Sequence, residues 1–257
     1  MKALDSFLFG TFPYICLAVF LLGSLLRFDR EQYTWKSDSS QLLRAGQLRL
    51  GSNLFHVGVL FLLAGHTVGL LTPHFVYEPF ISPGAKQVLA MASGGIFGLL
   101  GFLGVSILLH RRLTDVRVRV TSRPADIALL VLLWLQLALG LVSIHSSAQH
   151  LDGGLMMKFG EWAQRIVTFR PGAAEQLAEA NWVFRVHMVL GMTIFLVFPF
   201  TRMVHVWSGF GSLAYVWRPY QVVRTKRRIQ PRQPAPAGTT RSPSAQAIPE
   251  YEPRRAA

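Results

Sequence analysis

The chain has 257 residues, of which 51% are hydrophobic and only 15% charged, and its formal net charge is +13. Soluble domains carry about 25% charged residues, so this composition argues against an ordinary soluble protein. The positive charge would suit a nucleic-acid-binding protein, but the basic residues are confined to a few loops and the C-terminal tail. That distribution argues against nucleic acid as a partner.

Five apolar segments are long enough to cross a membrane. Residues 6–26, 50–77, 87–110 and 127–151 contain no Asp, Glu, Lys or Arg, and 186–201 reaches membrane length when its flanks are counted. A membrane-spanning helix needs about 20 apolar residues. The sequence therefore predicts an all-α integral membrane bundle of five transmembrane helices. We expect them at roughly 5–27, 50–75, 87–110, 126–149 and 181–207.

The loops differ in their content of basic residues. Lys and Arg number five in 27–49 and five in 111–123, but one in 78–86 and four in 152–185. Basic residues favour the cytoplasmic side of a membrane. We therefore expect the N-terminus on the outer side of the membrane and the C-terminus in the cytoplasm.

The composition changes near the C-terminus. Residues 1–228 are predicted to form the membrane domain, whereas 229–257 are rich in Pro and Arg and have no apolar periodicity. Such a segment buries too little apolar surface to offset the entropy of ordering it. The tail is therefore expected to be disordered in the cytoplasm.

Of the eight histidines, four lie near the ends of predicted membrane helices: His74, His110, His145 and His150. The other four fall inside such helices: His56 and His66 in one predicted helix and His187 and His205 in another. An ionisable side chain at that depth is costly and points to function. Ten residues of helix separate His56 from His66, or about 15 Å. Because the two helices run antiparallel, His66 should pair with His187 near the outer surface and His56 with His205 near the inner one. A continuous last helix would put His187 and His205, five whole turns apart, on one face.

Pairs of imidazoles can hold several kinds of metal centre. Zinc or copper would need further ligands, and no carboxylate or second cysteine lies at that depth. A haem needs only two imidazoles to fill both axial positions, and it then transfers electrons. Gly65 and Gly69 beside His66 would leave room for a porphyrin. The alternatives are structural histidines and a proton relay in a haem-free anchor or transporter.

Glycines also gather in the third predicted helix. They are Gly94, Gly95, Gly98, Gly101 and Gly104. Small residues at this spacing allow close approach of either a neighbouring helix or a flat cofactor. The sequence leaves both interpretations open.

Several long stretches carry a family resemblance. They are YTWKSDSSQLL, GSNLFHVG, GHTVGLLTPH, SAQHLDGGLMMK, FRVHMVLGMT and FPFTRMVHVW. From the N-terminus to about Arg224, the sequence closely resembles the gamma subunit, a di-haem cytochrome b, of membrane-bound respiratory nitrate reductase. The resemblance implies two b-type haems, with His56 and His205 as axial ligands of the inner haem and His66 and His187 as those of the outer one.

The resemblance also implies partners and a direction of electron flow. In this family a cytoplasmic molybdenum catalytic (alpha) subunit and an iron–sulfur (beta) subunit form a heterotrimer with the membrane chain. Menaquinol or ubiquinol would be oxidised near the outer haem, protons would be released outside, and the inner haem would pass electrons to the iron–sulfur subunit. A related membrane cytochrome b of a sulfite- or heterodisulfide-reductase-like complex is the nearest alternative.

Further residues are predicted to serve these sites. Lys86 is the only basic residue of its loop, and the matching lysine of the family lies at the quinol site; a lysine reaching toward lipid headgroups is the alternative. His66 could also contact quinol through its second ring nitrogen, and Gly65 and Gly69 would shape the slot. Three arginines are expected near the inner haem: Arg111, Arg112 and Arg202. They would either bind the haem propionates or only place positive charge on the cytoplasmic side of the membrane.

Two segments are predicted to dock the iron–sulfur subunit. They are the loop 27–49 and the segment 208–220, which share the predicted cytoplasmic side. This prediction rests on sidedness alone.

Overall fold

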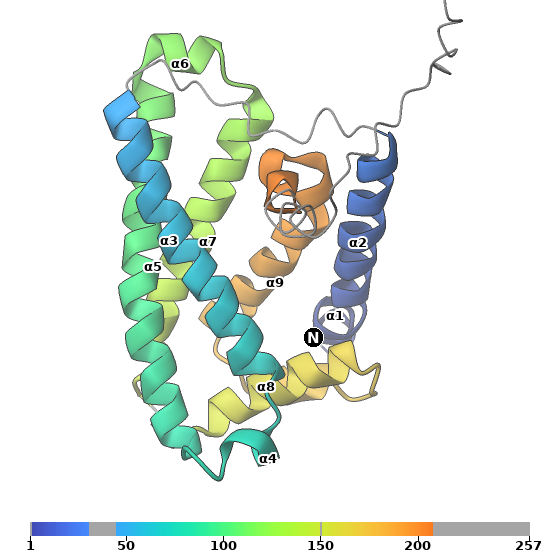
Figure 1. Cartoon of the computed structure of the whole chain (residues 1–257). Helices are drawn as coiled ribbons and strands as arrows, with labels where there is room; N and C mark the ends of the chain where they lie inside the picture. Colours follow the sequence, from blue (N-terminus) through green and yellow to red (C-terminus); the bar gives the residue numbers. More distant parts are fainter. Residues whose placement is uncertain (1, 31–44, 150, 208–257) are drawn as a thin grey trace, which may run out of the picture. The chain divides into compact units, whose positions relative to one another are not determined.

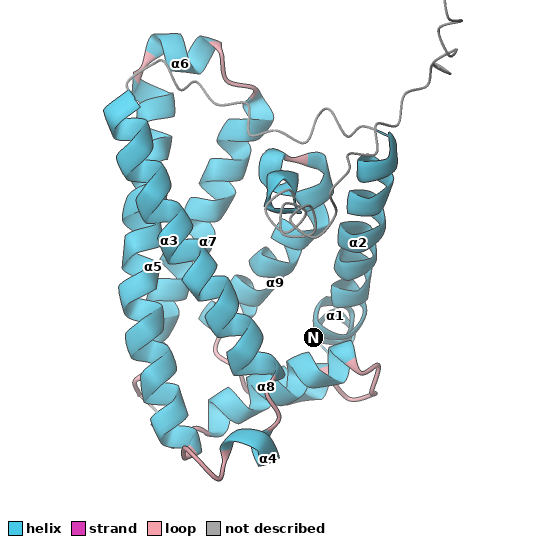
Figure 2. Cartoon of the chain, in the orientation of Figure 1, coloured by secondary structure: helices cyan, strands magenta, loops and turns pink. Residues whose placement is uncertain are grey.

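The computed structural model describes residues 2–30, 45–149 and 151–207, and these residues form helices, turns and loops without a strand (Figures 1 and 2). All the described residues belong to one compact unit. The predicted tail, 229–257, the predicted docking segment 208–220 and most of the loop 27–49 lie outside the described residues.

Five helical segments are long and apolar enough to cross a membrane, which confirms the predicted number and class. The first combines α1 (Lys2–Ser6), the π-helical turn η1 (Phe7–Thr11) and α2 (Phe12–Arg30). The other four are α3 (Ala45–Leu71), α5 (Pro83–Thr114), α7 (Pro124–Ser147) and α9 (Trp182–Val197). Shorter helices connect them: α4 (His74–Tyr77), α6 (Val116–Val120), α8 (Gly154–Val167) and η3 (Ala174–Leu177).

Prolines set several of the helix boundaries. Pro83 and Pro124 stand in the first turns of α5 and α7, where a helix makes no use of the missing amide hydrogen. The Ser82 hydroxyl caps α5 by accepting a hydrogen bond from the amide of Ala85 at 3.3 Å. α3 ends at Leu71, four residues before its predicted end, because Pro73 cannot continue the helix.

The last helix differs most from the prediction. α9 ends at Val197 and is followed by the 3₁₀ turns η4 (Phe198–Phe200) and η5 (Arg202–Val204), with Thr201 extended between them. Pro199 lacks the amide hydrogen that a continuing helix would need. The structure thus differs from the predicted continuous helix over 181–207 at residues 198–204, and helix resumes at His205, directly after η5.

α2 holds this broken segment in place. The Arg27 guanidinium donates hydrogen bonds to the carbonyls of Pro199, at 2.6 Å, and Thr201, at 2.9 Å. A Cβ on Gly23 would stand 2.8 Å from the Pro199 ring, so only glycine lets α2 approach so closely. These carbonyls, freed by the break in α9, thus receive donors from another helix.

The long helices pack against one another in a series. α3 lies along α5, α5 on α7, α7 on α9, and α9 on α2 (Figure 1). Among the described helices, α3 and α9 do not pack extensively against one another. α3 and α9, which carry intramembrane histidines, are therefore not held together by close helix packing.

Glycines create the closest seam, between α3 and α5. A Cβ on Gly58 would stand 2.4 Å from the amide nitrogen of Gly101, and one on Gly104 would stand 2.3 Å from that of Phe55. Real Cβ atoms do not approach backbone this closely, so both positions require glycine. At Gly101 and Gly104, the packing interpretation of the glycines in the third helix is the correct one.

The amphipathic helix α8 was not predicted from the sequence. It lies across the end of the bundle and buries Trp162 and Ile166 against Phe9 and Leu177 (Figure 1). The Trp162 indole donates a hydrogen bond of 2.9 Å to the carbonyl of Phe9. α8 thus ties the start of the chain to this end of the molecule.

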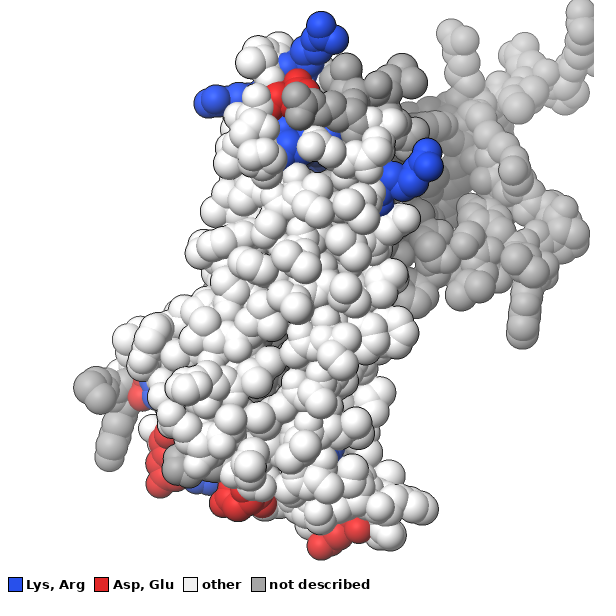
Figure 3. All heavy atoms as spheres, turned by 90° about the vertical axis from the view of Figure 1, so that its left-hand side faces the viewer, with Lys and Arg blue, Asp and Glu red and all other residues white. Residues whose placement is uncertain are grey.

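The two ends of the bundle differ in charge. A broad band without charged side chains separates an end with Lys and Arg, around α6, from an end with Asp and Glu, around α4 and α8 (Figure 3). Exposed arginines at the α6 end include Arg117, Arg119 and Arg123, and exposed carboxylates at the other include Glu78 and Asp152. Such a band is what a protein surrounded by lipid needs.

Candidate functional site: two histidine pairs and a polar cavity

The structure brings the four intramembrane histidines together as two pairs. The ring centroids of His66 and His187 lie 6.4 Å apart, and those of His56 and His205 lie 6.1 Å apart. α3 contributes one member of each pair. Its ten residues from His56 to His66 rise about 15 Å, as do the ten residues of α9 from His187 to Val197. The turn after Val197 then keeps His205 near the depth of His56.

Three of the four imidazoles are oriented by backbone carbonyls. The Nδ1 atoms of His56, His66 and His205 donate to the carbonyls of Ser52, at 2.7 Å, Leu62, at 2.8 Å, and Arg202, at 2.7 Å, respectively. A carbonyl only accepts, so each Nδ1 carries the hydrogen. In the neutral tautomer that carries its hydrogen on Nδ1, the lone pair of Nε2 is the one available for a metal.

His187 has a different environment. Its Nδ1 is buried without a hydrogen-bond partner, and so is the Oε1 of Gln136, whose Nε2 lies 3.5 Å from the His187 Nε2. Gly140 makes room for the ring, because a Cβ there would stand 3.1 Å from Cε1 of His187. Buried polar atoms without partners are uncommon, and a group bound beside His187 would supply the missing partner.

Both pairs fit the axial positions of a haem. An imidazole nitrogen lies about 2 Å from a transition metal and about 1.1 Å from its ring centre, so two opposed ligands place their centroids about 6.2 Å apart. The two observed separations bracket this value. In the described part of the chain, no group of three or more His, Cys, Asp or Glu could hold a bare metal ion.

Free space lies beside one of the pairs. A Cβ added to Gly65 or to Gly69 would meet no atom within 4 Å, so protein packing does not require glycine at either position. Gly58, near His56, is instead buried in the seam with α5. Open space thus adjoins Gly65 and Gly69, and its use by a porphyrin stays a prediction, whereas Gly58 is used for helix packing.

The predicted arginine cluster surrounds a carboxylate. Arg202 forms a two-point contact with Asp126, with Nε 2.8 Å from Oδ1. Arg112 stands 3.6 Å from the same carboxylate and donates to the Ser122 hydroxyl at 3.0 Å. Arg111 is nearby in sequence and only 1% exposed. Asp126, which the sequence reading missed, thus joins α5, α7 and the segment carrying His205; haem propionates as partners of the arginines remain a prediction.

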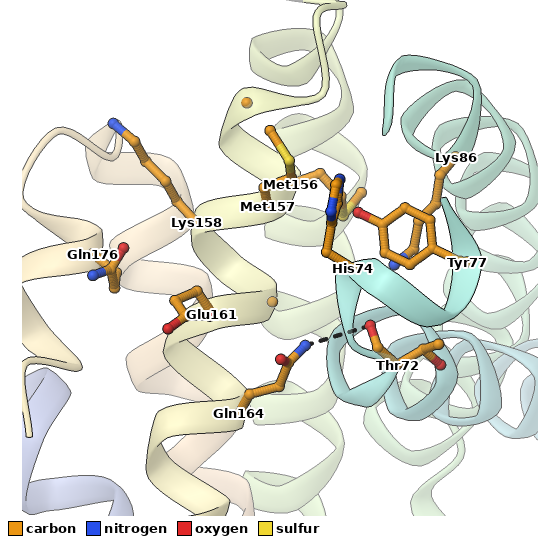
Figure 4. Close-up of a pocket in the computed structure, with 12 residues that line it drawn as sticks. Thr72, His74, Tyr77, Lys86, Met156, Met157, Lys158, Glu161, Gln164 and Gln176 are labelled. Atoms are coloured by element: carbon orange, nitrogen blue, oxygen red, sulfur yellow. Dashed lines mark hydrogen bonds between the residues drawn. The ribbon is translucent and has the colours of Figure 1, made fainter. Parts of the chain in front are cut away.

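Lys86 lines a cavity of about 410 Å³ at the end of the molecule formed by α4 and α8. Its ammonium lies over the Tyr77 ring, 3.6 Å from the centroid, as the close-up in Figure 4 shows. The polar residues that line the cavity include Thr72, His74, Tyr77, Lys86, Glu161 and Gln164. His66 does not line it, and its Nδ1, which was predicted to contact quinol, is bound to the Leu62 carbonyl in this structure.

The cavity forms where α8 crosses the end of α3. The Gln164 amide of α8 donates to the carbonyls of Leu70, at 3.1 Å, and Thr72, at 3.4 Å (Figure 4). Sequence reasoning missed α8 and its contribution to this wall. Its alternation of small, apolar and polar residues in GLMMKFGEWAQRIV is the signal that could have revealed an amphipathic helix.

Comparison with known proteins identifies close relatives. The sequence pattern of the nitrate reductase gamma subunit family matches residues 5–226. The respiratory nitrate reductase 2 gamma chain of Escherichia coli (strain K12) is 52% identical over 227 residues, which cover 88% of this chain and 100% of the relative. The respiratory nitrate reductase 1 gamma chain of that strain is 50% identical, with the same coverage. The nitrate reductase gamma chain of Bacillus subtilis (strain 168) is 37% identical over 85% of this chain and 97% of its own length.

Proposed function

The chain belongs to the nitrate reductase gamma subunit family, and from this premise we propose that it is the quinol-oxidising, di-haem cytochrome b subunit of a respiratory nitrate reductase. It would anchor an iron–sulfur subunit and a molybdenum catalytic subunit on the cytoplasmic side of a bacterial inner membrane. The family favours this reading over a cytochrome b of a sulfite- or heterodisulfide-reductase-like complex.

One observation carries the proposal: α3 and the α9 segment present two imidazole pairs at two depths, each spaced for a pair of axial ligands. His56 and His205 would hold one haem, and His66 and His187 the other. Bis-imidazole haems supply one-electron transfer without an open coordination position, so electrons from quinol could cross the membrane toward the iron–sulfur subunit.

The chain's own residues prepare each ligand. The carbonyls of Ser52, Leu62 and Arg202 hold three imidazoles in the tautomer whose Nε2 binds metal. Gly65 and Gly69 keep the space beside His66 open. Arg111, Arg112 and Arg202 would neutralise propionates of the inner haem, with Asp126 fixing two of these guanidinium groups.

The charge distribution supports the orientation. The α6 end carries exposed arginines, and basic residues favour the cytoplasm. The α4 and α8 end would then face the periplasm, together with the N-terminus, because Asp5 forms an ion pair with Arg185 at the start of α9. On this assignment His66 and His187 form the outer pair.

Lys86 is the residue we assign to the quinol. Its ammonium is half-buried in the first turn of α5, on the side proposed to face the periplasm. A cation there would stabilise negative charge on a quinol oxygen as the hydroxyl proton leaves. Contact of His66 with quinol would require its Nδ1 to leave the Leu62 carbonyl.

Substitution of single ligands tests the proposal. The intact complex with His66→Ala or His187→Ala should retain one haem of two and lose haem reduction by quinol by at least about 100-fold, because transfer must begin at the missing site. His56→Ala or His205→Ala should also retain one haem, reducible by quinol but not reoxidised by nitrate. The measurements are pyridine haemochrome content and stopped-flow absorbance.

The matched controls are His145→Ala and His110→Ala, which remove exposed histidines near helix ends. Both should keep two haems and the unaltered kinetics. If the four ligand variants also kept two haems, the pairs would not be axial ligands. A haem-free chain that conducts protons through the same histidines would instead support the proton-relay alternative.

A further inference from the structure

The polar cavity beside Lys86 has a second group of titratable residues that the proposed function does not use. α4 presents His74, and Glu78 follows it one turn later. The Nδ1 of His74 lies 3.1 Å from Oε2 of Glu78, and the His74 and Tyr77 ring centroids are 5.2 Å apart. Lys86, Tyr77, His74 and Glu78 thus form a continuous series of contacts from α5 to the end of α4.

Exposure increases along this series. Lys86 and Tyr77 are half-buried, whereas the side chains of His74 and Glu78 are 44% and 58% exposed. His74, Tyr77 and Lys86 line the cavity together (Figure 4). A cavity of about 410 Å³ is large enough for several water molecules, and its polar lining supplies the partners that such waters need.

We infer that this cavity is the proton outlet of the quinol site, and that His74, held by Glu78, is its terminal proton acceptor. The inference rests on the proposed quinol oxidation near Lys86. Oxidation of one quinol gives one quinone, two electrons and two protons. The electrons leave by the haems, and each proton leaves a quinol hydroxyl for water in the cavity, passes to His74, and is released to water outside.

The His74 imidazole is arranged for this task. With Glu78 accepting a hydrogen bond from Nδ1, the lone pair of Nε2 is free to take a proton from cavity water. The imidazolium formed then lies beside a carboxylate, which stabilises it until the proton leaves. The Lys86 ammonium cannot accept a proton, so it stabilises the quinol oxygen while the imidazole receives the proton.

The other charged groups around the cavity are already engaged. From α8, Lys158 is paired with Glu179 at 2.5 Å, and Glu161 accepts from Arg165 at 2.7 Å. Burial, with the nearby Glu78 carboxylate, raises the pKa of Tyr77, so its phenol stays neutral beneath Lys86. These pairings leave the His74–Glu78 pair as the exposed acceptor next to the lysine.

The test is rapid-mixing kinetics on the intact complex carrying His74→Gln. We expect haem reduction by quinol to slow about tenfold or more, with a larger solvent isotope effect, while haem reoxidation by nitrate is unchanged. Added imidazole should restore much of the rate in His74→Gly. The matched control, His145→Gln, removes another exposed histidine, near the end of α7, and should behave like the unsubstituted complex.

A structural role for the pair would give different results. The haem content of His74→Gln is measured first. If His74→Gln loses haem, Glu78→Gln, which keeps the His74 imidazole, takes its place. Glu78→Gln should slow haem reduction to a smaller extent. Unchanged reduction rate and isotope effect in a haem-replete variant would overturn the inference and leave the proposed function standing. Failure of quinol to reduce the haems of the unsubstituted complex would instead contradict the proposed function.

Discussion

The two sides of α3 use the same residue types for opposite purposes. Toward α5, Gly58 and its neighbours let two backbones meet so closely that no Cβ would fit. Outside this seam, Gly65 and Gly69 border open space, and His56 and His66 pair with His205 and His187. On this helix, therefore, one glycine allows close packing and others border open space, and the neighbouring atoms show which.

The difference also separates stability from function. A helix in lipid gains little from apolar contact alone and depends on close packing, which the α3–α5 seam provides. The α3–α9 side lacks such a seam and holds the polar groups instead. Substitutions on the first side should therefore affect folding, and those on the second should affect haem binding.

The largest effect is expected at the seam. Gly104→Ala would place a Cβ 2.3 Å from the Phe55 amide nitrogen, which forces α3 and α5 apart along their length. We expect the variant to fail to accumulate in the membrane, as measured by quantitative immunoblotting. Gly46→Ala, whose Cβ would meet nothing within 4 Å, is the control and should accumulate normally. Normal levels of the Gly104 variant would mean that the seam is not required.

The open side should respond in the opposite way. Gly65→Leu adds a side chain to space that is empty in the described protein, so the chain should accumulate normally while haem at the His66–His187 pair falls at least about tenfold. Reduced-minus-oxidised spectra would show one haem of two. Retention of both haems would show that this space is not the porphyrin slot.

A smaller effect is expected where the break after α9 is held. Asp126→Asn would leave Arg112 and Arg202 without their shared carboxylate in a partly buried setting, at a cost of about 3 kcal/mol in the free energy of unfolding. Because Arg202 also orients His205, the inner haem should be released first on heating. Thermal denaturation followed in the haem absorbance band measures the temperature at which each haem is released. Release of both haems at the same temperature would show that Asp126 does not stabilise the inner histidine pair.

The smallest effect on stability is expected for the ion pair between Lys158 and Glu179, which does not involve α3. Lys158 lowers the pKa of the fully exposed Glu179 carboxyl, so the pair stabilises the fold above the carboxyl's ordinary pKa and loses this contribution as the pH falls through the lowered value. Solvent screens such a pair strongly. Glu179→Gln should leave the denaturation temperature unchanged within error from pH 4 to pH 7, and a clear decrease at pH 7 would contradict this.

Much of the fold could be read from the sequence because lipid imposes simple rules. Uncharged runs of membrane length marked five helices, and the positions of the histidines along them predicted the two pairs. The break after Val197 was not predicted, because it depends not only on Pro199 but also on Gly23 and Arg27 of a helix far away in sequence. Because of that break, His205 lies near the depth of His56 in the bundle, where the two imidazoles form a pair.

The candidate site was predicted less completely than the helices. Lys86 and the four histidines could be predicted because they are isolated polar residues in or beside apolar segments and because the family resemblance assigns them roles. Gln136, Asp126 and the wall formed by α8 did not, because each gains its meaning from a contact across the bundle. Single-sequence patterns report periodicity and depth, whereas these contacts are properties of the packed molecule.

The most direct test of the central claim is the haem content and spin state of the purified complex. Four imidazoles closing both axial positions of two irons predict two haems per chain, both low-spin in the ferric state and neither able to bind carbon monoxide when reduced. Fewer than two haems in a fully assembled complex, or a high-spin haem that binds carbon monoxide, would contradict this account.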